Sequence, residues 1–235
     1  MQKHEATARV GASDALGARE PDAGREERRD GGAMNDQERE ALVKARWDAG
    51  DFDGASTLLI EKLGPGILGM LVRALDDEDV ACDVFSVWSE DVWKGLPRFQ
   101  WRASAKTWCY RLAKHAMARH LRDPRKRRER PLGTLEADRV VQEVRATTIR
   151  YMRTEVKDRF RELRRHFSAE DQMILVLHVD RGMAWNELAQ VMAEDDELAG
   201  PALTKESARL RQRFHRLTER LRELARQEGL LADEA

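Results

Sequence analysis

The chain has 235 residues, of which 36% are charged and 6% aromatic, and its acids and bases nearly cancel to a net charge of −1. This composition indicates a helix-rich protein with one large or two small domains and small cores. It excludes a transmembrane protein, because no apolar run approaches the ~20 residues that a spanning helix needs, and the polar start is unlike a signal peptide. Cys82 and Cys109 have neither metal-binding nor redox spacing. We therefore expect a cytoplasmic protein with no metal site and no cofactor.

Residues 1–33 contain no Phe, Trp or Tyr and mix charges of both signs with Gly and Pro. Such a stretch cannot bury enough apolar surface to offset the entropy cost of ordering its backbone. We predict that it is a disordered extension. Helical periodicity begins directly after Met34, which makes Met34 a candidate start site.

Residues 35–75 are predicted to form three helices that supply the first core layer. The first ends at Gly50, the second spans about 52–63, and the third spans 65–75 with Pro65 in the favoured first turn. A further helix over 76–96 opens with acids, which suit a helix N-terminus. Its apolar residues share one face and its polar residues another, the latter being Asp79, Asp83, Ser86 and Glu90. This acidic face is either simply solvated or a docking surface for a basic partner.

Residues 99–122 combine aromatic rings, spaced cations and helical periodicity. Ser104 can cap a helix that Asp123-Pro124 ends. Periodicity places one set on a packing face (Cys109, Leu112, Ala113, Ala116, His120) and another on a cationic face (Thr107, Arg111, Lys114, Ala118). Rings gather at the start of the stretch, where unstacked bases could stack on them, although core packing is the alternative: Phe99, Trp101, Trp108 and Tyr110. The stretch is typical of a helix that contacts nucleic acid.

Residues 123–146 are predicted to be a linker, with a basic start and the breakers Pro131 and Gly133. Helical periodicity resumes at about Thr147 and defines a second domain over 147–228, followed by a tail over 229–235. Within it, a helix capped by Ser168 ends at Gly182, a short helix spans 185–192, and a long helix spans 204–227.

This order predicts a helix-turn-helix, in which the second helix lies in the major groove. The turn over 193–205 is long and acidic. The last helix has a core stripe (Leu210, Phe214, Leu217, Leu221, Leu224). Its candidate DNA contacts are Lys205, Arg209, Gln212, Arg213 and Arg216.

Four short segments carry a resemblance to a known family. Residues 78–85 (EDVACDVF) and 107–113 (TWCYRLA) resemble region 2 of a bacterial extracytoplasmic-function (ECF) RNA polymerase sigma factor, and residues 186–189 and 211–217 resemble region 4. The sequence departs from the family pattern at Cys82, usually glutamine, at His115, commonly asparagine, and at Arg119, commonly an acid. The last two bear on which bases are recognised.

The resemblance implies an all-α fold of two small helical domains, region 2 over 34–122 and region 4 over 147–228, joined by a flexible linker. It implies that core RNA polymerase (β and β′ subunits) and promoter DNA are partners, and it leaves open an anti-sigma factor. The acidic face (Asp79, Asp83, Ser86, Glu90) would contact polymerase, and the second helix-turn-helix helix would read the minus-35 duplex. The minus-10 strand would contact Phe99, Trp101, Trp108, Tyr110, Arg111, Lys114 and His115.

Two other functions are weighed. A stand-alone helix-turn-helix regulator would bind duplex DNA as a dimer without polymerase. An enzyme using Cys109, His115 and His120 is disfavoured, because the histidines are five residues apart, which is poor spacing for two ligands on one helix face, and no carboxylate cluster accompanies them. We expect no catalytic residues in this chain, since catalysis would belong to the polymerase.

Overall fold

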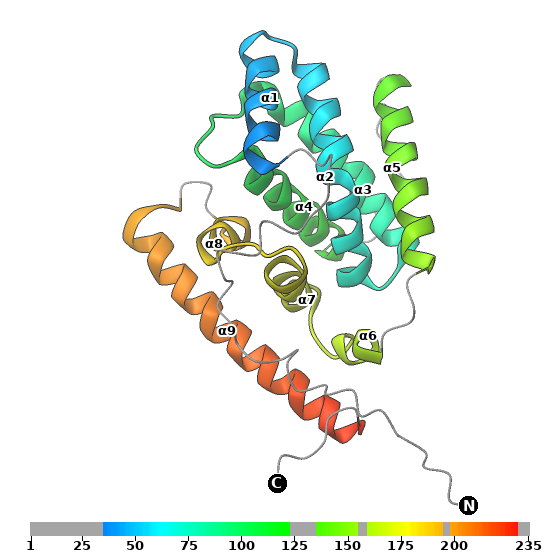
Figure 1. Cartoon of the computed structure of the whole chain (residues 1–235), viewed down its shortest axis with the longest axis vertical. Coiled ribbons are helices and arrows are strands. Elements are labelled where there is room, and N and C mark those ends of the chain that lie inside the picture. The colour runs from blue at the N-terminus through cyan, green and yellow to red at the C-terminus, as the bar shows by residue number, and fades with distance from the viewer. Residues whose placement is uncertain (1–34, 123–134, 155–158, 195–197, 230–235) are drawn as a thin grey trace, which may run out of the picture.

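The computed structural model describes residues 35–122, 135–154, 159–194 and 198–229, and the regular secondary structure in these ranges is helical (Figure 1). The predicted all-α class is confirmed. No helix in the described ranges is long and apolar enough to cross a membrane. The predictions for residues 1–33, for a start at Met34, for the basic run after Arg122 and for most of the tail fall outside the described residues.

The N-terminal bundle contains α1 (Asp36–Asp48), α2 (Phe52–Leu75), α3 (Glu78–Gly95), a 3₁₀ turn (Leu96–Arg98) and α4 (Ala105–Arg122). Asn35, Asp51 and Asp77 cap α1, α2 and α3 by accepting hydrogen bonds from backbone N–H groups three residues ahead. The α2, α3 and α4 helices pack around fully buried Phe85 and Trp88. The Trp88 Nε1–H donates to the Cys109 carbonyl over 3.0 Å and so ties α3 to α4.

Helix α2 is a single helix, so the predicted division at Pro65 is wrong. Pro65 lies on the exposed side of α2, as does Glu61 four residues earlier. The Glu61 carbonyl, which loses its usual N–H partner at a proline, can therefore turn to water. The buried side of α2 continues through Leu63, Ile67 and Leu71, and its packing outweighs the local cost of the proline.

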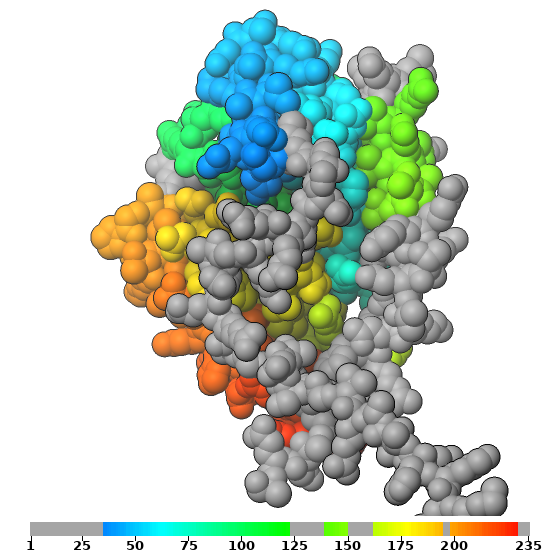
Figure 2. Space-filling model, in the orientation of Figure 1, coloured from blue at the N-terminus to red at the C-terminus, as the bar shows by residue number. Residues whose placement is uncertain are grey.

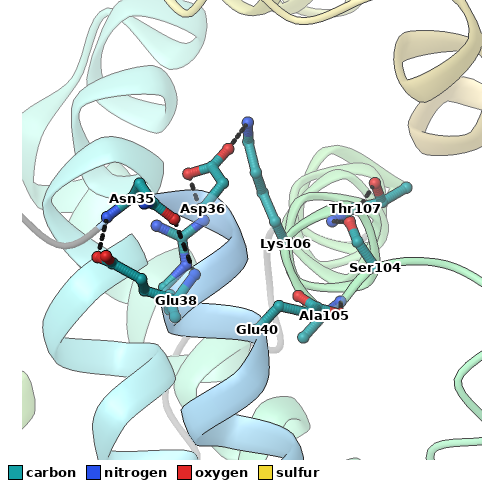
Figure 3. Close-up of polar contacts among 9 residues, drawn as sticks. Asn35, Asp36, Glu38, Glu40, Ser104, Ala105, Lys106 and Thr107 are labelled. Carbon is teal, nitrogen blue, oxygen red and sulfur yellow. Dashed lines mark hydrogen bonds and ion pairs between the residues drawn. The ribbon is translucent and has the colours of Figure 1, made fainter.

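The start of α4 is fixed to α1 by polar contacts (Figure 3). The Glu40 carboxylate accepts a hydrogen bond from the Ala105 backbone N–H over 2.8 Å, and the Lys106 ammonium lies 2.6 Å from the Asp36 carboxylate. Ser104 Oγ accepts from the Thr107 N–H over 3.0 Å, which confirms the predicted cap. A carboxylate and a hydroxyl thus satisfy N–H groups that the helix start leaves unpaired.

Helix α5 (Leu135–Thr154) begins within the predicted linker, and its residues 135–146 were predicted to be linker. It packs against α2 and α3, where Val141 and Val144 are buried. A Cβ atom on Gly64 of α2 would lie 3.0 Å from Val144 Cγ1, so any larger residue at this crossing would push against the Val144 side chain. The prediction of a linker over 135–146 is therefore wrong, because an apolar stripe too short to stand out in the sequence finds a partner surface on α2.

The C-terminal part contains α6 (Arg159–Arg164), α7 (Ala169–Leu175) with a π-helical turn (Val176–Asp180), α8 (Trp185–Met192) and α9 (Gly200–Gln227). The Ser168 cap, the end at Gly182 in a left-handed conformation (φ 62°) and the bounds of the short helix are as predicted. The long helix begins at Gly200 rather than at 204, with Pro201 in its first turn. The turn before it is therefore shorter than predicted.

The N-terminal and C-terminal parts pack against each other. In Figure 1, α7 and α8 lie beside α2 and α4, and in Figure 2 the yellow and orange atoms of the C-terminal helices adjoin the blue and green atoms of the N-terminal bundle. Their buried apolar side chains form one continuous cluster, which includes Leu59 of α2 and Leu188 of α8. The two predicted domains thus share a core instead of having one each.

Candidate nucleic-acid interface

The acidic face of α3 lies at the surface. Asp79 and Asp83 are exposed, and Glu90 is half-buried with the Lys94 ammonium 3.3 Å away. Ser86 donates to the Cys82 carbonyl and receives a 3.4 Å hydrogen bond from Arg145 of α5. The two aspartates are thus available to a basic partner, whereas Ser86 is partly covered by α5.

Three of the four predicted rings gather in one cluster. The Phe99 ring stacks on Trp108 at 4.8 Å between centroids and lies 4.9 Å from Trp101. Trp101 meets Trp47 of α1 edge-on at 6.0 Å, a partner that the sequence analysis did not identify. Phe99 and Trp108 are buried, and only Trp101 is partly open. The cluster therefore packs the core first, and base stacking on all three rings would need local rearrangement.

The fourth ring, Tyr110, lies apart from this cluster. Its hydroxyl would be 2.9 Å from a Cβ atom placed on Gly66 of α2, and the Arg181 guanidinium is close to the same point. Burial raises the pKa of the Tyr110 hydroxyl, against the opposing effect of Arg181. Tyr110 therefore belongs to the contact between the N-terminal and C-terminal parts.

Trp101 is held in an unusual backbone conformation. Its φ of 56° is left-handed, which a large side chain seldom adopts, and its indole Nε1 is buried without a hydrogen-bond partner. The Lys44 ammonium lies 5.2 Å from the Trp101 ring centroid, within the range of a cation–π contact. The loop before α4 thus carries local strain beside a cation.

The predicted cationic face of α4 is not open to solvent. Arg111 and Lys114 are each only 8% exposed. The Lys114 ammonium donates to the carbonyl oxygens of Met192 and Ala193, at 2.6 and 3.2 Å, and burial lowers its pKa. The expectation of an accessible cationic face is wrong for this conformation, because the amphipathic pattern shows that a face is polar but not that another helix covers it.

His115 lines a groove of about 570 Å³ between α3 and α4. The cations around it are Lys94, Arg98, Arg119 and Arg122, and the acid is Asp91, which pairs with Arg119. From the sequence, only Arg119 among these cations was related to base recognition, and it was not counted among the predicted DNA contacts. Arg119 and Arg122, four and seven residues after His115, lie on the same helix face as His115, and that spacing could have revealed them.

Helix α9 presents an exposed cationic surface. Lys205, Arg209, Gln212 and Arg216 are exposed. Arg213 instead forms ion pairs with Glu170 and Asp171 at the start of α7, at 2.9 and 2.7 Å. Arg209, Arg213, Arg216 and Arg220 line a groove of about 430 Å³. The structure therefore adds Arg220 to the predicted set and places Arg213 in a structural contact.

Side-chain contacts fix α9 against α8. The His178 ring lies 3.8 Å from Trp185 and 4.9 Å from Phe214 between centroids, and its Nδ1 is 3.0 Å from the Met183 carbonyl. Ser207 Oγ donates to Asn186 Oδ1 over 2.8 Å. Burial of the His178 imidazole lowers its pKa. A rigid pair of helices with cations on the outer side of the second suits a duplex groove.

The described residues thus form a helical protein with cations gathered around His115 and along α9. Cys109, the nucleophile of the alternative enzyme hypothesis, is fully buried, and this burial raises the pKa of its thiol. Both properties disfavour a reactive thiolate. The described residues contain no group of His, Cys, Asp or Glu that could hold a metal ion.

Residues 59–128 match the family model described as sigma-70 region 2. Residues 59–128 include α3, α4 and α2 from Leu59 onward. This part of the chain, which is less than half of it, is therefore similar to region 2 of sigma-70 RNA polymerase sigma factors. No curated protein and no solved structure matches the chain significantly.

Proposed function

We propose that the chain is an ECF-type sigma factor that binds core polymerase, recognises minus-35 and minus-10 promoter elements and promotes strand opening in the cytoplasm. The observation that carries the proposal is the order of the parts: a sigma-70 region 2 over 59–128 precedes a helix-turn-helix at α8 and α9. Between α4 and α7, the described residues contain only α5 and the short α6. This leaves little room for the additional domain of larger sigma factors.

Polymerase binding is assigned to α3. Asp79 and Asp83 are exposed one turn apart on the acidic face, so both can contact a basic surface such as the β′ coiled coil. Glu90 extends this face by about two turns, with Lys94 as a local partner that polymerase would displace. Ser86 lies between them at the edge of α5. Complementary charge would steer the encounter and hold the complex.

Minus-10 recognition is assigned to α4 and the loop before it. The groove around His115 has the excess of cations that a single strand requires, and Trp101 lies in the loop that leads to it. Arg111 and Lys114 extend the same contact when they are accessible. Neutral histidine offers one donor and one acceptor in a geometry different from that of asparagine. The base preferred at His115 should therefore differ from that of family members with asparagine.

Minus-35 recognition is assigned to α9. Lys205 and Arg209 are exposed in its first half, where a recognition helix meets phosphates and base edges, and Arg216 is exposed just beyond the middle of the helix. Gln212 is the best placed for base readout, because its amide can accept from N6 and donate to N7 of one adenine in the major groove. Arg213 would read a base only after leaving Glu170 and Asp171.

The test is whether specific DNA binding depends on core polymerase. Fluorescently labelled genomic fragments are incubated with the protein alone, with core polymerase alone and with both, and bound fragments are sequenced. A sigma factor yields enriched fragments only when both are present. Tight, specific binding by the protein alone, together with dimerisation in sedimentation experiments, would instead establish the stand-alone helix-turn-helix regulator.

A further inference from the structure

Helix α1 holds both ends of the loop over 99–104, which joins the 3₁₀ turn to α4. Before the loop, the Trp47 indole Nε1–H donates to the Leu96 carbonyl over 2.9 Å. After it, the Glu40 carboxylate accepts from the Ala105 backbone N–H over 2.8 Å (Figure 3). Glu40 and Trp47 lie two turns apart on α1, so they project from the same side of that helix. One side of α1 therefore fixes where the loop begins and where it ends.

The part of α1 between these two residues contacts the middle of the loop. The Trp101 ring meets the Trp47 ring edge-on at 6.0 Å between centroids. The Lys44 ammonium, one turn from both Glu40 and Trp47, lies 5.2 Å from the Trp101 centroid. The loop is thus held by α1 at its start, its middle and its end.

These contacts account for the strained backbone at Trp101. A left-handed φ of 56° is costly for a large side chain, and the Trp101 indole Nε1 is buried without a hydrogen-bond partner. Such a conformation persists only where the surrounding contacts over-determine it. The hydrogen bonds of Glu40 and Trp47 supply this constraint from a separate helix. We expect the loop to relax to other conformations when either bond is removed.

The constrained loop offers three different side chains in succession. Gln100 and Arg102 are exposed, and Trp101 between them is partly exposed. An amide bonds to base edges, an indole ring stacks on a base, and a guanidinium pairs with a phosphate. Gln100 and Arg102 were not among the predicted DNA contacts. Together with Trp101, they give the loop the chemistry that an unpaired strand requires.

We propose that Glu40 and Trp47 are positioning residues, which hold the loop over 99–104 in the shape that receives the unwound minus-10 strand through Gln100, Trp101 and Arg102. The proposal rests on the proposed function, because that function assigns this loop to the minus-10 strand. A loop that is already ordered loses little conformational entropy when the strand binds, and its side chains keep the geometry that base discrimination needs. Helix α1 therefore contributes to recognition without contacting a base.

Substitutions at Glu40 separate positioning from loss of charge. Glu40→Ala removes the acceptor of the Ala105 N–H, a group without a partner inside α4 because it lies in the first turn. Glu40→Gln removes the charge but keeps a carbonyl oxygen that accepts the same bond. Glu61→Ala, at an exposed position of α2, is the control for the loss of an acid. The conservative variant should therefore restore what Glu40→Ala loses.

A tryptophan pair tests the other end of the loop. Trp47→Phe keeps a ring beside Trp101 and removes only the N–H that donates to Leu96. Trp93→Phe is the matched control, because the Trp93 indole also donates over 2.9 Å, to Asp53 at the contact of α3 with α2. Both tryptophans are partly exposed. The two variants thus lose equivalent hydrogen bonds, and only one of these bonds holds the loop.

The shape of the loop is measured by amide hydrogen exchange in the free full-length protein. We expect exchange over 99–105 to be about tenfold faster in Glu40→Ala and Trp47→Phe than in their controls, and unchanged in Glu40→Gln. Equal exchange in each variant and its control would show that α1 does not hold the loop.

Strand opening is then measured with core polymerase, on a promoter found by run-off transcription, as the permanganate reactivity of unwound thymines. We expect opening to fall about tenfold in Glu40→Ala and about fivefold in Trp47→Phe, and to stay within about twofold in Glu40→Gln and both controls. Binding to core polymerase and to a minus-35 duplex should be unchanged in all variants. A merely structural role would instead lower these two affinities together with opening.

Normal opening by Glu40→Ala, or a parallel loss of opening and of duplex binding, would overturn the proposal. Failure of the proposed function looks different, since the wild-type protein itself would then bind no core polymerase and open no promoter. The positioning role would fall with it.

Discussion

The side-chain ammonium of Lys114 lies 2.6 Å from the carbonyl oxygen of Met192, so a cation of α4 donates a hydrogen bond to a carbonyl at the C-terminal end of α8. One residue thereby links the part of the chain that matches sigma-70 region 2 to the helix-turn-helix. The contact explains why a cationic residue on an amphipathic helix is buried.

The first prediction concerns the acidic face of α3. Replacing Asp79 and Asp83 together by Ala should weaken binding to core polymerase by about 2 kcal/mol or more, roughly 30-fold, because the charge pairs formed on docking are lost. Affinity is measured by titrating labelled protein with core polymerase. The control is Glu219→Ala with Glu223→Ala, two exposed acids of α9. Equal affinity of the two double variants would remove α3 from the polymerase contact.

The second prediction concerns phosphate contacts of α9. Arg209→Ala or Arg216→Ala should each lower the slope of log affinity against log salt by about 0.9 for a minus-35 duplex, since one fewer phosphate is neutralised. Gln212→Ala should instead cost about 1–3 kcal/mol at one base pair and leave the slope unchanged. Arg46→Ala, on exposed α1, serves as the control. Slopes that match those of Arg46→Ala would place α9 outside the duplex contact.

The third prediction concerns pH. The folded protein lowers the pKa of His178, so the unfolded state binds more protons, and stability must increase with pH in this range. The contribution is full above about pH 6.5, the unfolded value, and declines as the pH falls toward the lower folded pKa. Urea unfolding between pH 5 and 8 should show this decline. It should be weaker in His178→Leu and retained in His166→Gln, a change at an exposed histidine.

The fourth prediction concerns the contact of α5 with α2. Gly64→Ala should destabilise the protein by about 1–3 kcal/mol, because the added methyl meets Val144 at 3.0 Å and Phe85 at 3.2 Å. In a Val144→Ala background, the cost of the same change should shrink, which gives a measurable coupling energy. Chemical denaturation of the four proteins gives this energy. Zero coupling would mean that α5 does not pack at Gly64.

The accuracy of the sequence predictions depended on whether the deciding interaction was local. The Ser104 and Ser168 caps and the bounds of α8 were predicted, because a cap needs only a side chain and an N–H group three residues on. The continuity of α2 through Pro65 and the helical state of residues 135–146 depend on partners far away in the chain. Such partners leave no trace in local periodicity.

The candidate site shows the same difference between features set by local sequence and features set by distant partners. Exposed Asp79, Asp83 and Arg216 could be identified from charge and helical spacing. The burial of Lys114 under α8 and the pairing of Arg213 with α7 could not, because both depend on how two separate segments meet. The Phe99 cluster was anticipated as a group of rings, but its role in the core became clear only with Trp47 of α1 in place.

Run-off transcription tests the central claim most directly. Core polymerase is incubated with fragmented genomic DNA and nucleotides, with and without the protein, and the 5′ ends of the transcripts are sequenced. We predict transcripts that require the protein and whose start sites share two upstream elements at constant spacing. The absence of any protein-dependent transcript, with core polymerase that is active on nicked DNA, would contradict the assignment as a sigma factor.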